Sequence, residues 1–319
     1  MNNPWLNIQK PKAELNIRLV AEHHPLRLYW GVDAQGHYLF VADVPEAGMP
    51  SRGSLPELEG IKIGATQNDT QGKIVLLLND TNNWELFHSL CNDLVRASDN
   101  AHDDILACAI LLRRLQRWQD FLRRSRSLIL PLEEIKGLVG ELLFLSDPVA
   151  EQFGWDAAIG FWKGPEDAPQ DFAIHDTAVE VKCQSGSSKP SVRITSVDQL
   201  SPQLPRGYLV VQTLATADAD DEKAFTLNGL AQSIRDSLIN ATHASRERFE
   251  TLLFLAGYLY NEHYDDIIFQ RVGTASYRLN EGFPRLTPGA IPAGIQRVTY
   301  QLELEACTAF AEPLTLKAP

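Results

Sequence analysis

The chain has 319 residues, of which 44% are hydrophobic and 22% are charged. This composition supports a substantial core and two or three domains, and it excludes disordered and fibrous proteins. Lys and Arg number 29 against 41 Asp and Glu, which gives a net charge of −12. That charge argues against a protein that coats nucleic acid through bulk positive charge, while it leaves room for a local basic face.

The N-terminal sequence MNNPWLNIQKPKAELN has no basic region followed by an apolar run. No later stretch approaches the roughly 20 apolar residues that a membrane span needs. Cys91, Cys108, Cys183 and Cys307 are scattered in apolar surroundings without a CxxC pair. We therefore expect buried, reduced thiols in a cytoplasmic protein without a membrane segment.

The first part of the chain predicts strands followed by helices. Segments 26–32 and 37–44 flank one turn rich in Asp and Gly, and segments 61–66 and 73–78 flank another, so we expect two hairpins. Apolar residues then recur at helical spacing from Trp84 to Val95 and from Ile105 to Trp118, which predicts two helices.

The end of the second predicted helix is strongly basic. A solvated helix face is the simpler interpretation of this stretch, and a surface that faces phosphates is the alternative. Its basic residues are Arg113, Arg114, Arg117, Arg123, Arg124 and Arg126.

A third helix is predicted over 132–145, between Pro131 and Asp147-Pro148. Beyond it the pattern returns to alternation, which is interrupted by two further helices. The strands predicted here are 170–174, 178–183, 192–195, 208–214, 267–279 and 296–307, and the helices are 227–240 and 245–259.

This order of elements predicts an α/β protein with three regions. Residues 1–127 form a β-rich and then helical domain, residues 128–243 form a mixed α/β core, and residues 244–319 form a small α+β extension. No internal repeat is visible.

Several common catalytic motifs are missing from the sequence. It contains no GxSxG, GxGxxG or HExxH. Gly72-Lys73 is not part of a phosphate loop, because the preceding glycine, Gly64, is too distant and because Ile74 stands where such a loop has the Ser or Thr that binds metal. We therefore do not expect a serine hydrolase, a dinucleotide-binding protein or a zinc enzyme.

One strand carries a row of polar side chains. In the segment 177–184, alternation places Glu180, Lys182 and Gln184 on the face opposite the apolar residues. An ordinary half-exposed strand has the same pattern. Glu134 and Lys136 have the same spacing, but they lie in the first turns of a helix, where residues two apart point in different directions, so we regard this second pair as irrelevant to function.

Asp171 strengthens the interpretation of the strand as a site. It lies one short hairpin upstream, so its carboxylate is expected beside that of Glu180, within about 6 Å. Two adjacent carboxylates repel each other unless a cation lies between them, and Mg²⁺ needs only one or two carboxylates. With Lys182 to orient water or stabilise charge, these groups suit phosphodiester hydrolysis.

Glu141 is a fourth candidate, on the preceding helix GLVGELLFL. Helical spacing places it on the same side as Gly137, Leu138 and Leu145, which predicts an inward-facing carboxylate. A surface glutamate is the alternative.

A helix with an internal Glu, then an Asp, then Glu-x-Lys on the next strand resembles the PD-(D/E)XK nuclease superfamily. The strings GLVGELLFL, QDF, EVK, ITS, DQL and a late FPRLTP, with Trp155 and Trp162 between the first two, look like an uncharacterised bacterial subfamily whose members are found beside restriction and phage-defence genes. The nuclease signature covers about a quarter of the chain, whereas the similarity to the subfamily reaches the C-terminal part.

The resemblance implies a restriction-endonuclease-like core in the order α-β-β-β-α-β. It also implies that Asp171 and Glu180 bind Mg²⁺, with Mn²⁺ as a substitute, that Lys182 is the catalytic lysine and that Glu141 is an auxiliary acid. The chain departs from the motif at Gln170, which replaces the proline before the Asp.

Two further residues are candidate substrate contacts. Gln184 follows Lys182 on the same face of its strand, so it could contact DNA or a water on the metal. Ser196 begins a capping-box sequence, so helix capping is the preferred interpretation of its hydroxyl, with phosphate binding as the alternative.

These features predict a Mg²⁺-dependent DNA endonuclease of a bacterial restriction or phage-defence system. The acidic charge favours a protein partner that helps to deliver DNA. The alternatives are a non-catalytic DNA-binding or assembly module on the same fold, and an RNA-directed or repair nuclease.

Overall fold

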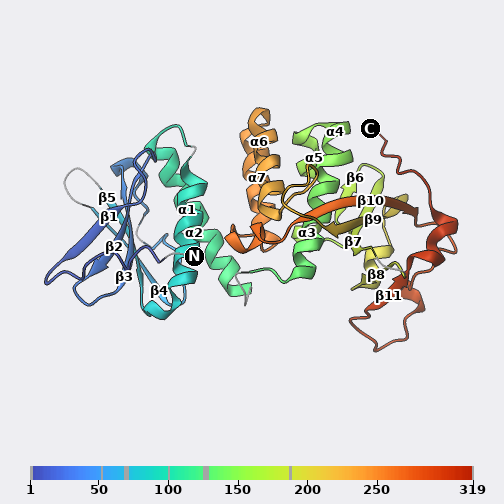
Figure 1. Ribbon diagram of the computed structural model, residues 1–319, viewed down its shortest axis with the longest axis horizontal. Coiled ribbons are helices and arrows are strands. Elements are labelled where there is room, and N and C mark those ends of the chain that lie inside the picture. Colours follow the sequence, from blue (N-terminus) through green and yellow to red (C-terminus); the bar gives the residue numbers. More distant parts are fainter. Residues whose placement is uncertain are drawn as a thin grey trace. The chain divides into compact units, whose positions relative to one another are not determined.

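The structure is a computed structural model that describes residues 3–51, 53–67, 72–99, 101–124, 129–186 and 189–317, without the side chains at 120, 121, 123 and 124. The chain divides into two compact units, Met1–Leu128 and Ile129–Pro319. Figure 1 shows the helices and strands of both units. No helix in the described ranges is both long enough and apolar enough to cross a membrane.

The first unit contains a five-stranded antiparallel sheet in the order β1-β2-β3-β5-β4. Both predicted hairpins are confirmed, since β2 pairs with β3 and β4 pairs with β5. The side chain of Asp33 caps the first turn by accepting three backbone N–H bonds. Gly36, which has no Cβ, adopts the positive φ of 96° that this turn requires. The strands are β1 Leu15–Leu19, β2 Arg27–Asp33, β3 Tyr38–Val44, β4 Ile61–Gln67 and β5 Gly72–Leu78.

The two helices predicted after these strands are present as α1 Trp84–Asp99 and α2 Asp104–Arg124. Helical spacing puts Phe87, Leu90 and Leu94 on one face of α1, and all three are fully buried.

The basic end of α2 is not a uniform basic surface. Arg114 is buried, and its guanidinium donates to both carboxylate oxygens of Asp93 at 2.6 and 2.7 Å. The prediction of a solvent- or phosphate-facing residue is therefore wrong for Arg114, while Arg113 is exposed. The side chains of Arg123 and Arg124, and the whole of Arg126, lie outside the part of the chain that the structure describes.

The second unit is built on a four-stranded sheet in the order β10-β9-β7-β6. β7 and β9 are parallel, whereas β6 and β10 run antiparallel to their neighbours. The strands are β6 Phe172–Ile174, β7 Thr177–Ser185, β9 Arg206–Thr216 and β10 Phe269–Arg278.

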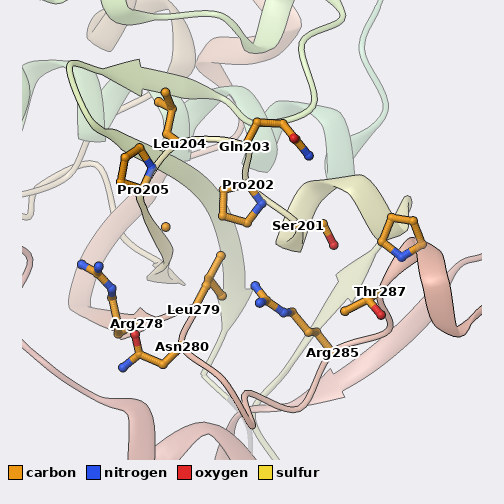
Figure 2. Close-up of a pocket in the computed structure, with 12 residues that line it drawn as sticks. Ser201, Pro202, Gln203, Leu204, Pro205, Arg278, Leu279, Asn280, Arg285 and Thr287 are labelled. Carbon is orange, nitrogen blue, oxygen red and sulfur yellow. The ribbon is translucent and has the colours of Figure 1, made fainter.

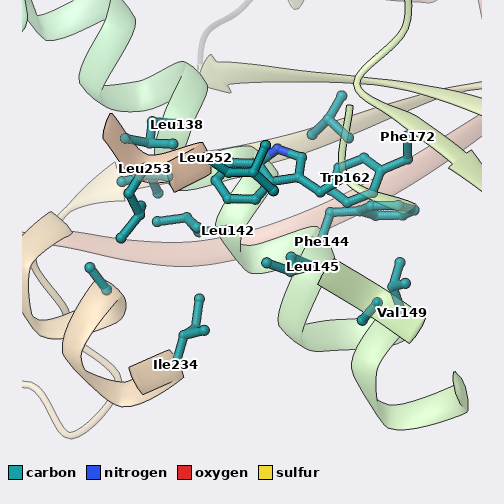
Figure 3. Packing of buried hydrophobic residues seen from close by; sticks show 14 of the residues in the cluster. Leu138, Leu142, Phe144, Leu145, Val149, Trp162, Phe172, Ile234, Leu252 and Leu253 are labelled. Carbon is teal, nitrogen blue, oxygen red and sulfur yellow. The ribbon is translucent and has the colours of Figure 1, made fainter. Parts of the chain in front are cut away.

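Helices cover one face of this sheet, where the core of the unit lies (Figures 1 and 3). Trp162, Phe144 and Phe172 pack together in this core, and the ring centroids of the two phenylalanines are 4.8 Å apart. The helices are α3 Leu132–Phe144, α4 Glu151–Phe153, α5 Trp155–Phe161, α6 Leu227–Ser237 and α7 His243–Leu255.

The two glycines of α3 differ in how closely they pack against the sheet. A Cβ on Gly140 would stand 2.4 Å from the Sγ of Cys183, so the helix backbone touches β7 there. A Cβ on Gly137 would meet nothing within 4 Å among the described residues. Of these two glycines, only Gly140 therefore brings the helix backbone close to the sheet.

The opposite face of the sheet is covered by a two-stranded sheet of β8 Ser191–Ile194 and β11 Tyr300–Glu303. The mixed α/β class is confirmed, but the strand predicted over 192–195 pairs with β11 and not with the main sheet. It is followed by the short 3-10 turn Val197–Leu200, where the superfamily order predicts a helix. The strand predicted over 296–307 ends at Glu303, and the 3-10 turn Leu304–Phe310 follows it.

The boundary predicted at residues 243/244 falls inside the second compact unit. Ile234 and Leu238 from the region before the boundary share one core with Phe249 and Leu252 of α7. The segment 244–319 therefore contributes to the same core as 128–243.

Candidate active site

Asp171 and Glu180 lie opposite each other on neighbouring strands. Phe172 of β6 pairs with Val179 of β7, and continuing this register by one residue places Asp171 across from Glu180. Directly opposed residues of antiparallel strands have Cβ atoms roughly 5 Å apart, so the hairpin brings the two carboxylates to one place.

The backbone fixes the position of Asp171. Its Oδ2 accepts a 2.7 Å hydrogen bond from the N–H of Val181, and its carbonyl oxygen accepts bonds from the N–H groups of Lys163 and Gly164 at 2.7 and 2.9 Å. The segment around Lys163 is thereby tied to the edge of the sheet beside the two acids.

Lys182 joins the acids from the same face of β7. Its Nζ lies 2.6 Å from Oε1 of Glu180, whose side chain is 1% exposed. The side chain of Lys182 is 18% exposed, so solvent reaches Lys182 more than it reaches Glu180.

Glu141 reaches the same cluster from α3. Its Oε2 accepts a 2.7 Å hydrogen bond from the indole Nε1 of the buried Trp162. The carboxylate interacts electrostatically with Asp171, Glu180 and Lys182. The expectation that Glu141 points inward is therefore correct.

Gly164 provides the space in which two of these carboxylates meet. A Cβ at this position would stand 2.8 Å from Oδ1 of Asp171 and 2.8 Å from Oε2 of Glu141. The two oxygens are therefore no farther apart than twice that distance. Any side chain at residue 164 would enter the space between them.

Burial and mutual repulsion keep the acids from ionising freely. Burial raises the pKa of Glu141 and of Glu180 well above the ordinary value of 4.5, and the charge of Asp171 raises both further. Burial also raises the pKa of Asp171 from 3.8. For Lys182 burial acts downward, but the carboxylates of Glu180 and Asp171 dominate and raise its pKa. Three acids thus share one ammonium.

The donor set fits a hard divalent cation. Neither carboxylate oxygen of Glu180 receives a well-formed hydrogen bond from a described residue, and the bond to Asp171 uses only Oδ2. Within the described ranges no three acidic, His or Cys side chains are already arranged as metal ligands. Mg²⁺ requires only one or two carboxylates and retains waters, so the oxygens of Asp171 and Glu180 suffice.

The other predicted residues lie apart from this cluster. Glu134 is exposed on α3, and Lys136 contacts Glu133 and Ser185 at 3.4 and 3.2 Å. Gln184 donates to Thr213 at 3.1 Å, while its buried Oε1 has no hydrogen-bond partner among the described residues.

Ser196 is the N-cap of the turn Val197–Leu200, in a complete capping box with Gln199. This confirms the preferred interpretation of its hydroxyl. A structural link joins this turn to the site, because Gln170 donates to the carbonyl of Asp198 at 2.6 Å.

Two residues of the cluster were not predicted from the sequence as part of a site, namely Trp162 and Gly164. The sequence identifies Trp162 only as part of a Trp-containing segment. A buried indole N–H needs a hydrogen-bond acceptor, so this residue type could have predicted a polar partner such as Glu141. Gly164 gives no signal in the sequence, because nothing there reveals what its missing side chain would meet.

A buried Asp and Glu-x-Lys on a hairpin, with a Glu from the preceding helix beside them, define an α/β protein with a PD-(D/E)XK-type constellation. Residues 1–305 match the family described as "Putative PD-(D/E)XK family member, (DUF4420)". The chain belongs to this family, and the predicted resemblance to the superfamily is confirmed. No curated protein and no solved structure matches the chain.

Proposed function

We propose that the protein is a Mg²⁺-dependent DNA endonuclease that hydrolyses phosphodiester bonds. The observation that carries this proposal is the buried carboxylate of Glu180, which lies beside Lys182 and opposite Asp171 without a well-formed hydrogen bond. Asp171 and Glu180 would hold Mg²⁺ or Mn²⁺, which relieves their repulsion. When bound, such a cation lowers the pKa of water and stabilises charge on phosphoryl oxygens.

The remaining groups have separate tasks in this proposal. The ammonium of the partly exposed Lys182 would orient the attacking water and stabilise negative charge that develops on the phosphorus centre. Glu141, with its raised pKa and its hydrogen bond from Trp162, would serve as an auxiliary acid that positions groups around the cation. Gln184, which follows Lys182 on the same face of β7, would contact substrate or a water on the cation. Ser196 can contribute to substrate binding only in addition to its capping role.

The biological setting that we propose is a bacterial restriction or phage-defence system. The support for this is the resemblance to proteins found beside such genes, together with the net charge of −12, which favours delivery of DNA by a partner protein. The four free cysteines support a reducing compartment, and we place the protein in the cytoplasm.

A cleavage assay tests this function. Purified protein is incubated with plasmid, linear duplex, single-stranded DNA and RNA, each with Mg²⁺, Mn²⁺ or EDTA. We expect plasmid linearisation that requires the cation. Glu180→Gln should abolish cleavage, because the amide removes the charge that binds the cation. Glu134→Gln, at an exposed position of α3, should cleave like wild type.

The substrate panel also separates the alternatives. Cleavage of RNA alone would reassign the substrate, and cleavage only from DNA ends would replace endonuclease by exonuclease. A wild type that binds DNA but cuts no nucleic acid, with or without partner proteins from the same gene neighbourhood, would identify a non-catalytic DNA-binding or assembly module.

A further inference from the structure

A polar pocket lies where β9 begins and β10 ends, outside the site described above. Its volume is about 350 Å³, which is within the range of small-ligand sites. The guanidinium of Arg285 points toward Leu279, into the middle of the pocket (Figure 2). The polar residues that line it are Ser201, Gln203, Arg278, Asn280, Arg285 and Thr287.

The charge of this pocket is unusual for an acidic protein. None of the described residues that line it is Asp or Glu. Elsewhere in the unit arginines pair with carboxylates, as Arg206 does with Asp176 and Arg235 with Glu250. Arg278 and Arg285 have no such ion pair among the described residues. Only the guanidinium of Arg285 points into the middle of the pocket, because Arg278 lies over Tyr208 and strand alternation puts this pair on the other face of the sheet.

The contacts of the two arginines leave donors unused. Arg285 donates one bond to the carbonyl of Leu200, and burial lowers the pKa of its guanidinium below the usual value. The guanidinium of Arg278 stacks over the ring of Tyr208 at 4.9 Å. The hydroxyl of Ser201 is buried and has no hydrogen-bond partner among the described residues. A planar guanidinium with unused N–H donors recognises phosphate oxygens.

Two backbone positions of the pocket lie close to the acidic cluster in the main sheet. Glu180 pairs with Leu209 of β9, and Leu209 pairs with Tyr277 of β10. Gly207 and Leu279 of the pocket lie two residues farther along these strands. With strands about 4.8 Å apart and a rise of about 3.3 Å per residue, the pocket is on the order of 10 Å from Glu180, roughly three nucleotides along one strand of B-DNA.

We infer that this pocket binds a backbone phosphate of the nucleic acid a few nucleotides from the bond that is cut. The inference rests on the proposed nuclease function for the identity of the ligand. It gives a role to Arg285 and Thr287 of the FPRLTP segment, which the catalytic cluster does not use. It also explains how an acidic chain can retain a local contact with DNA.

Binding measured in EDTA tests the pocket independently of cleavage. The dissociation constants of fluorescein-labelled duplex DNA, single-stranded DNA and RNA are compared for wild type, Arg285→Gln, Thr287→Ala and the exposed control Arg246→Gln on α7. Loss of one charged hydrogen-bonding group should weaken binding about tenfold at low salt. The slope of log K against log salt should fall by about 0.9 for duplex DNA. Arg246→Gln should match wild type.

The possible results are distinct. Equal affinities for wild type and both pocket variants would overturn the phosphate pocket, provided that melting curves show each variant to be folded. Inorganic phosphate that raises the melting temperature of wild type but not of Arg285→Gln, with unchanged oligonucleotide affinity, would overturn the nucleic-acid assignment. A wild type that binds through Arg285 yet cuts nothing would support the pocket and overturn the nuclease. Should Arg285→Gln not fold, Thr287→Ala decides.

Discussion

The two units each bury a carboxylate beside a cation and a tryptophan, with opposite results. In the first unit Asp93 accepts two bonds from Arg114 and a third, at 2.8 Å, from Nε1 of Trp118. In the second unit Trp162 donates to Glu141 in the same way, but three acids share the single ammonium of Lys182. We call the first cluster balanced, because its described contacts pair one guanidinium with one carboxylate, and the second cluster unbalanced, because one ammonium faces three carboxylates.

The difference shows how a buried charge can be assigned to stability or to function. A fully paired ion pair asks for no further ligand, and removing one partner leaves an uncompensated charge. A cluster with excess negative charge and an unsatisfied carboxylate costs stability until a cation binds. Such imbalance is expected at functional sites, where perturbed pKa values concentrate. Five experiments test this contrast.

Removing the cation of the balanced cluster should have the largest effect. Arg114→Ala leaves the carboxylate of Asp93, whose side chain is 11% exposed, without its cation. The variant should lose about 3–5 kcal/mol of unfolding free energy. Urea unfolding followed by tryptophan fluorescence measures this cost. Arg113→Ala, at the exposed neighbouring position, should stay within about 0.5 kcal/mol of wild type. Arg114→Met combined with Asp93→Asn should recover much of the loss, and failure to recover would mean that packing dominates.

Removing the cation of the unbalanced cluster should instead damage activity. Lys182→Ala should lower the cleavage rate by a factor on the order of 10² or more, as loss of a charge stabiliser does. Lys136→Ala carries the same change at a lysine of α3 that is equally exposed and lies outside the cluster, and it should leave the rate near that of wild type. Equal losses at both lysines, measured in single-turnover cleavage, would contradict the role of Lys182.

A divalent cation should stabilise the unbalanced cluster by mass action. At 100 times its dissociation constant, Mg²⁺ should add about 2.7 kcal/mol to the unfolding free energy, which appears as a rise in melting temperature. Asp171→Asn should be at least as stable as wild type without metal, because it removes one of the repelling charges, and should lose the cation-dependent rise. A variant that keeps the full rise would remove Asp171 from the metal site.

The space at Gly164 should matter for cleavage more than for folding. In Gly164→Ala the new methyl group would press on the carboxylates of Asp171 and Glu141 from 2.8 Å, and we expect about a tenfold lower rate from displaced ligands. Gly160→Ala in α5, where a Cβ meets nothing within 4 Å among the described residues, is the control. A Gly164→Ala enzyme as fast as the control would show that the carboxylates tolerate displacement.

The acids of the unbalanced cluster should also make stability in EDTA depend on pH. Because the pKa of Glu180 is higher in the folded than in the unfolded state, the folded protein binds more protons, and its stability falls as pH rises above about 4.5. The slope for one proton is at most about 1.4 kcal/mol per pH unit. Glu180→Gln should flatten the decline in melting temperature between pH 5 and 8. A wild type whose stability rises over that range would show that the carboxylates are not strained.

Local patterns were sufficient to predict most elements and the core of the candidate site. Alternation over 177–184 and helical spacing over 132–145 depend only on neighbouring residues, so the sequence determined that β7 presents Glu180 and Lys182 together and that Glu141 lies on a helix. The short hairpin likewise made Asp171 a neighbour of Glu180, because a tight turn sets the register.

Contacts between distant segments were decided only by the tertiary structure. The strand at 191–194 pairs with residues more than 100 positions away, and Arg114 is buried because α2 packs on α1, which carries Asp93. The roles of Gly164 and of the pocket around Arg285 depend on residues that are distant in the sequence and adjacent in the structure. Sequence spacing encodes which way a side chain points within its own element, whereas which elements meet depends on how all the apolar faces are buried together.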